Sequence, residues 1–363
     1  MTELSNPEKV GKFYTPTEND IAILSGQWNC AFSGGKDSTS LVTWIEWLRR
    51  TGQIQCESPS LVRSDTTIED ALLDDIAHDL MNLLRTCGWK CAEVKPKIHE
   101  KMFNRILGIG NAPIHPGGRN MRWCTRATKI DPMNRYRKEI EHEGWIVTGL
   151  RWGESSARDE KIKKFSGCSA GGECGIPPPG KKTYSPLLEW KLCNIMDWLS
   201  GMMGESVRRK LEDIYPLTKR LIEIYNVKIG QRGLLDWTDP EVSMSRFGCI
   251  GCPAIASERA APISVMRRYG TESPLLELYD VWYEARRRDN RCIRIKKGKD
   301  GRGPIRMSVR KRLFYRVLDI QTRAGVVLIN EEDQTFIRQC WEEKRYPRGW
   351  SESDESTTEP TLF

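Results

Sequence analysis

The sequence lacks the features that mark a secreted or membrane-spanning chain. Its first residues, Met1 to Glu8, contain neither a basic start nor an apolar run, and a secretory signal peptide needs both. No later stretch is apolar and long enough to cross a bilayer. We therefore expect a cytoplasmic protein that has no membrane partner.

A disulfide framework is also not expected, although the chain contains twelve cysteines. Cytosolic reductants keep thiols reduced, so metal binding or sulfur chemistry explains cysteines better in a chain without an export signal. Cys249 and Cys252 form a Cys-x-x-Cys knuckle, whose neighbouring glycines leave room for two thiolates to face one metal centre. Two thiolates do not complete a site. Four would suit either an iron-sulfur cluster or structural zinc, and spacing alone does not separate them.

A Walker-type Gly-x-x-x-x-Gly-Lys-Ser/Thr motif is absent as well, which argues against the ordinary P-loop kinases and NTPases. Residues 33 to 38 instead read Ser-Gly-Gly-Lys-Asp-Ser, directly after a buried strand expected at 27 to 32. Two adjacent glycines let the backbone turn sharply, so that its NH groups and the next helix N-terminus can converge on phosphate oxygens. The pattern therefore predicts a nucleotide site; the alternative is a simple turn before a capped helix.

Each remaining residue of this loop has an expected role. Lys36 supplies a mobile positive charge, and Asp37 is placed either to hold magnesium or to cap the helix. The hydroxyls of Ser33 and Ser38 can donate hydrogen bonds to phosphate oxygens. With Gly34 and Gly35, these residues form the predicted phosphate loop.

Hydrophobic periodicity predicts an α/β fold. Strands are expected at 27 to 32, 60 to 64, 89 to 94 and 145 to 148, with helices after the phosphate loop and at about 69 to 86 and 127 to 143. Alternating strands and helices imply a parallel sheet with helices on both faces. Residues 160 to 182 are rich in Gly, Pro and Lys and read as loop, and mainly helical segments follow, at 187 to 199, 205 to 225 and 274 to 288.

This reading divides the chain into four parts. Residues 1 to 26 are a lead-in, 27 to 200 a nucleotide-binding α/β domain, and 201 to 350 a helical region that carries the knuckle. Residues 351 to 363 are polar and acidic and are expected to be a disordered tail.

Positive charge is concentrated in one stretch. Residues 286 to 312 contain thirteen Lys or Arg against two Asp, in a chain whose net charge is +8. Aromatic residues flank the stretch: Trp282, Tyr283, Phe314 and Tyr315. A basic surface with aromatic neighbours suits a nucleic-acid backbone, whereas a solvated helix face and loop is the structural alternative.

The loop resembles the signature of the PP-loop superfamily, which includes phosphoadenylyl-sulfate reductases and thiolation enzymes. The resemblance implies a Rossmann-like sheet of the adenine nucleotide alpha hydrolase type and cleavage of ATP between the α and β phosphates. It places Asp65 and Thr66 beside the nucleotide. A second family pattern, Gly-x-Arg-x-x-Glu-Ser-x-x-Arg, matches Gly149, Arg151, Glu154, Ser155 and Arg158. Each arginine of this pattern can make two hydrogen bonds to phosphate or sulfate oxygens. The resemblance therefore assigns catalysis to Lys36, Asp37, Arg151 and Arg158. For both arginines, a surface salt bridge is the alternative.

The same resemblance extends the knuckle to a cluster. In adenylyl-sulfate reductases a Cys-Cys pair joins a later Cys-x-x-Cys to hold a [4Fe-4S] cluster, and Cys124 matches the second member of that pair, with Trp123 in place of the first. The fourth ligand is then expected to be Cys168 or Cys174. The resemblance favours iron-sulfur over zinc.

Within the superfamily the chain is most similar to the DndC-type component of DNA phosphorothioation systems. Matching segments lie in the family's order between residues 27 and 325, among them Arg122-Trp123-Cys124-Thr125, Ser185-Pro186-Leu187-Leu188 and Ser245-Arg246-Phe247-Gly248-Cys249. The family's additional cysteine just before the last segment is missing, since Val242 to Met244 stand there. The chain is also shorter than expected of the family.

This similarity implies an ATP pyrophosphatase and sulfurtransferase that uses ATP and Mg²⁺. An acceptor oxygen attacks the α phosphorus, pyrophosphate leaves, and sulfur delivered as a persulfide displaces AMP. The implied acceptor is nucleic acid, DNA rather than tRNA. Implied partners are a cysteine desulfurase and other subunits of a modification complex.

Two rival functions remain open. One is a reductase of adenylated sulfate, against which the lack of a Glu-Cys-Gly-x-His tail at residues 359 to 363 counts strongly. The other is a non-catalytic, nucleotide-binding iron-sulfur subunit of a DNA modification or defence complex.

Overall fold

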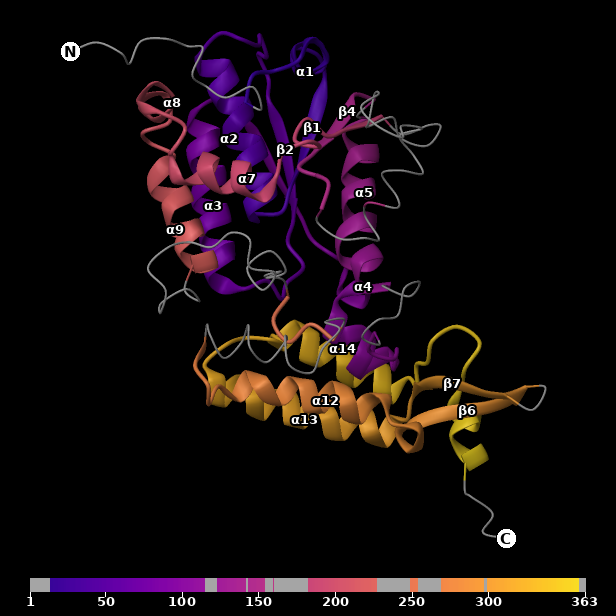
Figure 1. Cartoon of the computed structure of the whole chain (residues 1–363). Helices are drawn as coiled ribbons and strands as arrows, with labels where there is room; N and C mark the ends of the chain where they lie inside the picture. The colour runs from indigo at the N-terminus through magenta and orange to yellow at the C-terminus, as the bar shows by residue number, and fades with distance from the viewer. Residues whose placement is uncertain are drawn as a thin grey trace. The chain divides into compact units, whose positions relative to one another are not determined.

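A computed structural model of the chain describes residues 14–114, 123–141, 143–153, 159, 182–226, 249–253, 269–296 and 299–358. The chain divides into two compact units, shown in Figure 1. The first, here called the sheet unit, comprises Met1–Ser64, Asp70–Val94 and Arg137–Phe247. The second, the helical unit, comprises Asp65–Glu69, Lys95–Tyr136 and Gly248–Phe363.

A five-stranded sheet with the order β3-β2-β1-β4-β5 forms the centre of the sheet unit, and all of its neighbouring strands are parallel. The strands are β1 (Trp28–Phe32), β2 (Ser60–Ser64), β3 (Lys90–Val94), β4 (Trp145–Thr148) and β5 (Thr183–Tyr184). The predicted α/β class with a parallel sheet is confirmed. Four strands lie where the sequence predicts them, whereas the two-residue β5 is too short to leave a periodic signal.

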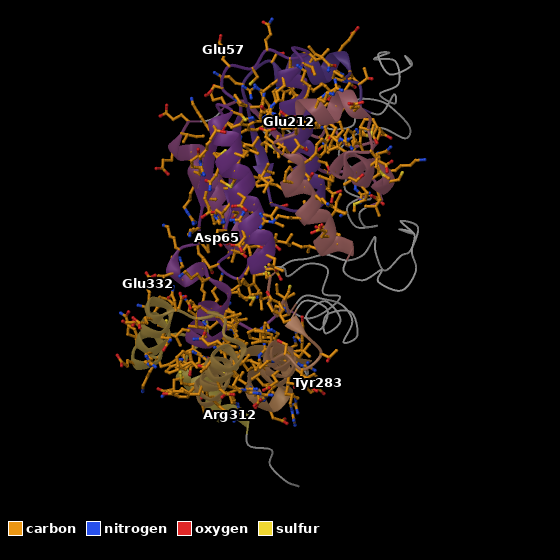
Figure 2. The ribbon with its side chains drawn as sticks, turned by 90° about the vertical axis from the view of Figure 1, so that its left-hand side faces the viewer. Glu57, Asp65, Glu212, Tyr283, Arg312 and Glu332 are labelled. Carbon is orange, nitrogen blue, oxygen red and sulfur yellow. The ribbon has the colours of Figure 1, made fainter. Side chains whose placement is uncertain are left out.

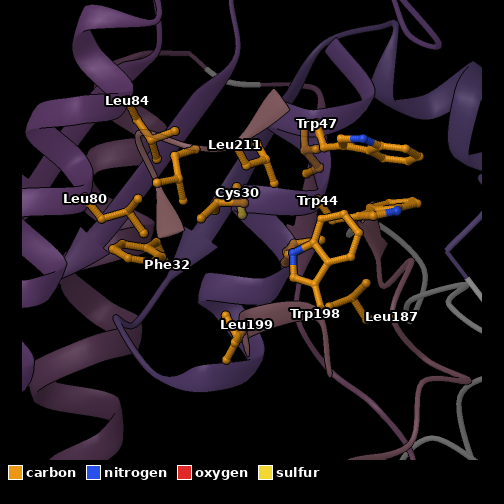
Figure 3. Packing of buried hydrophobic residues seen from close by; sticks show 14 of the residues in the cluster. Cys30, Phe32, Trp44, Trp47, Leu80, Leu84, Leu187, Trp198, Leu199 and Leu211 are labelled. Atoms are coloured by element: carbon orange, nitrogen blue, oxygen red, sulfur yellow. The ribbon is translucent and has the colours of Figure 1, made fainter. Parts of the chain in front are cut away.

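Helices pack around this sheet: α1 (Glu18–Leu24), α2 (Lys36–Arg50), α3 (Ala71–Thr86), α7 (Leu192–Ser200), α8 (Glu205–Lys210) and α9 (Tyr215–Asn226). Figure 3 shows Trp44, Trp47 and Trp198 on one side of the core, and Phe32, Leu80 and Leu84 on the other. The Trp198 indole NH donates to the Thr43 hydroxyl at 2.9 Å, so its one polar group is satisfied in the core. The helix predicted at 205 to 225 is two helices, because residues 211–214 form a turn.

The helical unit is built around α12 (Glu277–Arg286), α13 (Met307–Ala324) and α14 (Glu331–Glu342). Two short π-helices, η3 (Asn104–Ile109) and η4 (Arg126–Ile130), pack in or next to this unit's core, and η4 follows α4 (Trp123–Thr125) directly. α5 (Asp131–Glu139) continues from η4 and contains the boundary between the units. The predicted helix at 127 to 143 therefore begins with a π turn and ends earlier than expected.

Short elements complete the helical unit. They are the 3-10 turns η2 (Ile98–Glu100), η5 (Pro274–Leu276), η6 (Arg288–Asn290) and η7 (Glu352–Thr358), and the antiparallel hairpin β6 (Arg291–Lys296) and β7 (Lys299–Ile305). η7 corrects the expected disorder of the tail for residues 352–358. An ion pair of 2.6 Å between Arg294 and Asp354 joins that turn to β6, an attachment that composition does not reveal.

No helix among the described residues is long and apolar enough to cross a membrane.

Candidate nucleotide site and cysteine group

The predicted phosphate loop joins β1 to α2. Gly34 has φ +72°, and a Cβ there would lie 2.8 Å from the Cβ of Ala77 in α3. Both the left-handed backbone and the close helix favour glycine. Gly35 then takes the N-cap position of α2, where it offers no side chain to the helix's first NH groups. The start of α2 therefore has amide donors that no N-cap side chain occupies and that an anion could bind.

The two serines of the loop bond to each other. The Ser33 NH donates to Ser38 Oγ at 3.2 Å, the two hydroxyl oxygens lie 3.0 Å apart, and the Ser38 hydroxyl donates to the Gly35 carbonyl at 3.1 Å. These bonds fix the shape of the turn. Their predicted donation to phosphate stays a prediction.

Asp37 lies between two cations. Its carboxylate is 2.8 Å from Lys36 Nζ and 2.5 Å from Arg151 Nε. Burial raises the pKa of this carboxyl, but Lys36 and Arg151 outweigh burial and hold the pKa below its usual value. Asp37 is therefore ionised at neutral pH. Because Gly35 is the N-cap residue, Asp37 does not cap α2; a role in binding magnesium remains a prediction.

Arg151 reaches Asp37 because β4 ends against the first turn of α2. A Cβ on Gly149 would lie 2.8 Å from the Asp37 carbonyl oxygen and 3.1 Å from the Ser38 nitrogen. Only glycine allows this approach of the two backbones. The Arg151 side chain is buried, so the surface salt bridge considered as its alternative does not describe it. Gly149 and Arg151 thus lie together with the phosphate loop, and their predicted role in binding a nucleotide stays a prediction.

Tyr225, at the C-terminal end of α9, joins this loop although the sequence did not single it out. Its hydroxyl oxygen accepts a hydrogen bond of 3.3 Å from the Lys36 backbone NH, and Lys36 Nζ lies 5.6 Å from its ring centroid. In the sequence Tyr225 reads as one more apolar residue at helical spacing. Nothing local distinguishes it from a core residue.

Asp65 and Thr66 belong to the helical unit, although they directly follow β2. Asp65, labelled in Figure 2, accepts a bond of 2.6 Å from the Thr67 NH and pairs with Lys95 at 3.0 Å. Thr66 is fully buried and donates to Glu69 at 2.9 Å. Their predicted place beside the nucleotide stays a prediction.

The knuckle cysteines are held by main-chain bonds within the helical unit. The Cys252 NH donates to the Cys249 carbonyl at 3.2 Å, and the Trp282 indole NH donates to the Gly251 carbonyl at 2.5 Å. Gly251 has φ +61°, and a Cβ there would lie 2.6 Å from the Leu278 side chain. The tight turn between the two cysteines therefore requires glycine.

Cys124 lies near this knuckle. Burial is the main cause that raises the pKa of Cys124, and the charge of Cys252 contributes next. Burial, followed by the charge of Glu69, raises the pKa of Cys249 to about 12. Lys129, in η4, pairs with Glu69 at 3.4 Å. Burial lowers the pKa of Lys129, but Glu69 and the two thiols Cys249 and Cys124 raise it above its usual value.

This donor set fits a thiolate-bound metal or cluster in its chemistry. Buried thiols stay protonated unless a cation compensates their charge, and a thiophilic metal supplies that compensation. The described residues nevertheless contain no group of three or more His, Cys, Asp or Glu side chains positioned as metal ligands. The predicted fourth ligands, Cys168 and Cys174, lie outside the described residues, as do Glu154, Ser155 and Arg158.

The basic stretch is partly an internal scaffold. Arg310 is fully buried and donates to the carbonyls of Gly108, Ile305 and Arg345. Arg291 is buried and donates to the Gly303 carbonyl. The flanking aromatics Trp282 and Phe314 are also buried. These residues hold the fold and do not face a partner.

Other parts of this stretch are exposed. A surface pocket of about 430 Å³ on α12, η6 and α13 is lined by Tyr283, Arg287, Arg312 and Arg316 together with acidic residues. Figure 2 shows Tyr283 and Arg312 at one end of the helical unit. Tyr283 is 63% exposed. Glu284 pairs with both Arg312 and Arg316, at 2.5 and 3.2 Å, so part of the pocket's positive charge is balanced.

Comparison with known proteins gives little further information. No protein-family model matches the chain, and no curated protein matches it. Among solved structures it is similar to the U34-tRNA thiolase NcsA from Methanococcus maripaludis with its [4Fe-4S] cluster. That alignment covers 66% of this chain and 85% of the other, at 16% identity and a TM-score of 0.33.

Proposed function

We propose that the chain is an ATP pyrophosphatase that adenylates a nucleic-acid acceptor for sulfur insertion, as in DNA phosphorothioate modification. The observation that carries the proposal is the convergence of Lys36 and Arg151 on Asp37 at the start of α2. Two cations and the first amides of a helix offer fixed positive potential to a polyphosphate. The carboxylate between them orients both side chains.

In this mechanism the chain acts mainly by positioning and charge stabilisation. Lys36, in α2, and Arg151, which follows β4, would contact the phosphates from two sides. These contacts would align the α phosphorus with the acceptor oxygen. As the bond to pyrophosphate breaks, the same cations stabilise the negative charge that develops on the leaving group. Magnesium, held with the help of Asp37, would offset the charge of the β and γ phosphates.

The cysteine group supports the sulfur half of the proposal. Cys124, Cys249 and Cys252 would hold a [4Fe-4S] cluster, with Cys168 or Cys174 as the fourth ligand and zinc as the alternative metal. With all four irons bound by cysteine thiolates, such a cluster would serve as a structural or electron-transfer group. Sulfur would reach the chain as a persulfide from a cysteine desulfurase. The persulfide would attack the adenylated acceptor and release AMP, and a second thiol would then reduce the resulting acceptor–S–S bond, leaving one sulfur on the acceptor and a disulfide between the second thiol and the carrier cysteine.

Labelled ATP tests the reaction class. We expect α-labelled ATP to yield AMP and pyrophosphate in the presence of DNA or tRNA, and Lys36→Ala to abolish the yield. Lys90→Ala, at an exposed lysine of β3, is the matched control and should retain activity. Release of ADP and phosphate by the wild type would contradict the proposal, since it means cleavage between the β and γ phosphates.

Salt dependence tests the nucleic-acid acceptor. Tyr283 offers a ring on which a base can stack, and Arg287 is 60% exposed beside it in the same pocket. We expect DNA binding to weaken as salt rises, and Tyr283→Ala to weaken it several-fold. Arg209→Ala, at an exposed arginine of α8, should not change binding. Binding that is independent of salt would argue against this partner.

A further inference from the structure

We infer that Tyr225 competes with a phosphate oxygen for the Lys36 backbone amide, so that binding of a polyphosphate displaces the tyrosine hydroxyl. This inference rests on the proposed nucleotide site and adds to it a residue from α9. Residues 36 and 225 are far apart in sequence, yet both belong to the sheet unit.

The geometry places the Tyr225 hydroxyl at the mouth of the phosphate loop. Its oxygen is 3.3 Å from the Lys36 nitrogen and would be 3.6 Å from a Cβ on Gly35. The residue is only 5% exposed, because α9 packs against α2, α3 and α7. The hydroxyl therefore lies where an atom bound by the loop's amides would lie.

The Lys36 amide is the first NH of α2 and has no partner within the helix. An N-cap side chain bonds the NH of N2 or N3, so it does not reach this N1 donor. The tyrosine hydroxyl supplies an acceptor for it from α9. It is a neutral acceptor at a long distance, whereas a phosphate oxygen is charged and makes the shorter, stronger bond. The phosphate oxygen should therefore displace the hydroxyl.

Tyr225→Phe isolates this contact. The ring remains, so its packing and its position beside Lys36 Nζ are kept, but the competing oxygen is removed. The amide is then free for a phosphate oxygen. Because the hydrogen bond from the Lys36 amide to Tyr225 no longer has to be broken, we expect binding of inorganic pyrophosphate and ATP to become roughly three- to tenfold tighter.

Calorimetric titration of the full chain with inorganic pyrophosphate, and separately with ATP, tests the inference. Tyr215→Phe is the matched control, because it removes a buried hydroxyl from the same helix and leaves Tyr225 in place; it should not change affinity. Thermal unfolding of both variants without ligand checks that they fold.

Each outcome has a distinct meaning. Tighter binding by Tyr225→Phe alone supports competition. Unchanged binding overturns it, and so does weaker binding, which would make the hydroxyl a phosphate ligand. Tighter binding without any formation of AMP would sustain the inference while the proposed reaction fails. No pyrophosphate binding by the wild type or by Tyr225→Phe would overturn both.

Discussion

The buried Arg151 and the half-buried Asp37 form an ion pair that joins the segment after β4 to the first turn of α2. Arg151 Nε donates to Asp37 Oδ1 at 2.5 Å, and the two side chains are 5% and 19% exposed. Burying either charge alone is costly, so the pair is stable only while both members are present. The same contact fixes where the arginine's remaining NH groups can meet a ligand.

Arg151→Ala should therefore lower stability as well as nucleotide binding. Loss of Arg151 leaves a half-buried carboxylate that Lys36 still compensates in part, and we expect the free energy of unfolding to fall by about 2 kcal/mol. Arg151→Lys should restore only part of this, because an ammonium group lacks the planar fork. Urea unfolding and ATP titration measure both effects. Arg209→Ala, an exposed arginine, is the control, and an equal loss there would contradict the argument.

Acid should weaken the Asp37 contact. The folded-state pKa of Asp37 is lowered by Lys36 and Arg151 despite the opposing effect of burial. A lowered pKa contributes stability that is present above the unfolded value of about 3.9 and is lost as pH falls through the folded value. The stability difference between wild type and Asp37→Asn should therefore be constant from pH 7 to pH 5 and shrink below about pH 4. A difference that does not shrink at all below pH 4 would show that it does not arise from ionisation of Asp37.

Gly149→Ala should displace the phosphate loop, because Gly149 lies directly after β4 and against the first turn of α2. Its Cβ would lie 2.8 Å from a backbone oxygen of α2, which must then move away from β4. Overpacking of this kind costs about 1–3 kcal/mol, and ATP affinity should fall because the loop shifts. Gly26→Ala is the matched control, since its nearest neighbour would be at an ordinary 3.5 Å. Equal melting temperatures for the two variants would refute the steric argument.

Metal analysis distinguishes three roles for the cysteine group: an iron-sulfur cluster, a zinc site or packing. After anaerobic purification, we expect iron and acid-labile sulfide in the wild type, and loss of both in Cys124→Ser, Cys249→Ser and Cys252→Ser. Cys193→Ser, at an exposed cysteine, should keep the wild-type content. Stoichiometric zinc in a colourless protein would mean that the cysteines bind a structural zinc ion and not a cluster. Absence of any metal from freshly prepared protein would leave the three thiols as packing residues.

Local signals in the sequence predict much of the sheet unit. β1 and β4 are short, mainly apolar runs with polar or glycine residues on either side, and the phosphate loop is a contiguous string. Asp37 and Arg151 were both predicted as site residues. Their pairing was not, because a contact between residues 114 positions apart depends on the order of strands in the sheet.

The features that the sequence did not predict also depend on contacts between distant parts of the chain. Tyr225 contacts the phosphate loop, but in the sequence it has the spacing of an ordinary core residue. Arg310 lies in a basic stretch, yet its side chain bonds three carbonyls inside the helical unit. The hairpin of β6 and β7 contains both basic and apolar residues. Its sequence therefore reads as a basic stretch, and its strands are not predicted. In each case, the partner that defines the residue's role comes from a distant part of the chain.

Tyr215 provides a final test, on packing alone. Its hydroxyl is buried and has no hydrogen-bond partner, and burial raises the pKa of the group to about 12. An unsatisfied buried hydroxyl costs free energy, whereas the ring contributes apolar contacts. Tyr215→Phe removes the cost and keeps the ring. We therefore expect the free energy of unfolding to stay the same or rise by about 1 kcal/mol, as measured by urea denaturation. A clear loss of stability would mean that the hydroxyl has a partner, such as an ordered water, and that the helix start at Tyr215 depends on it.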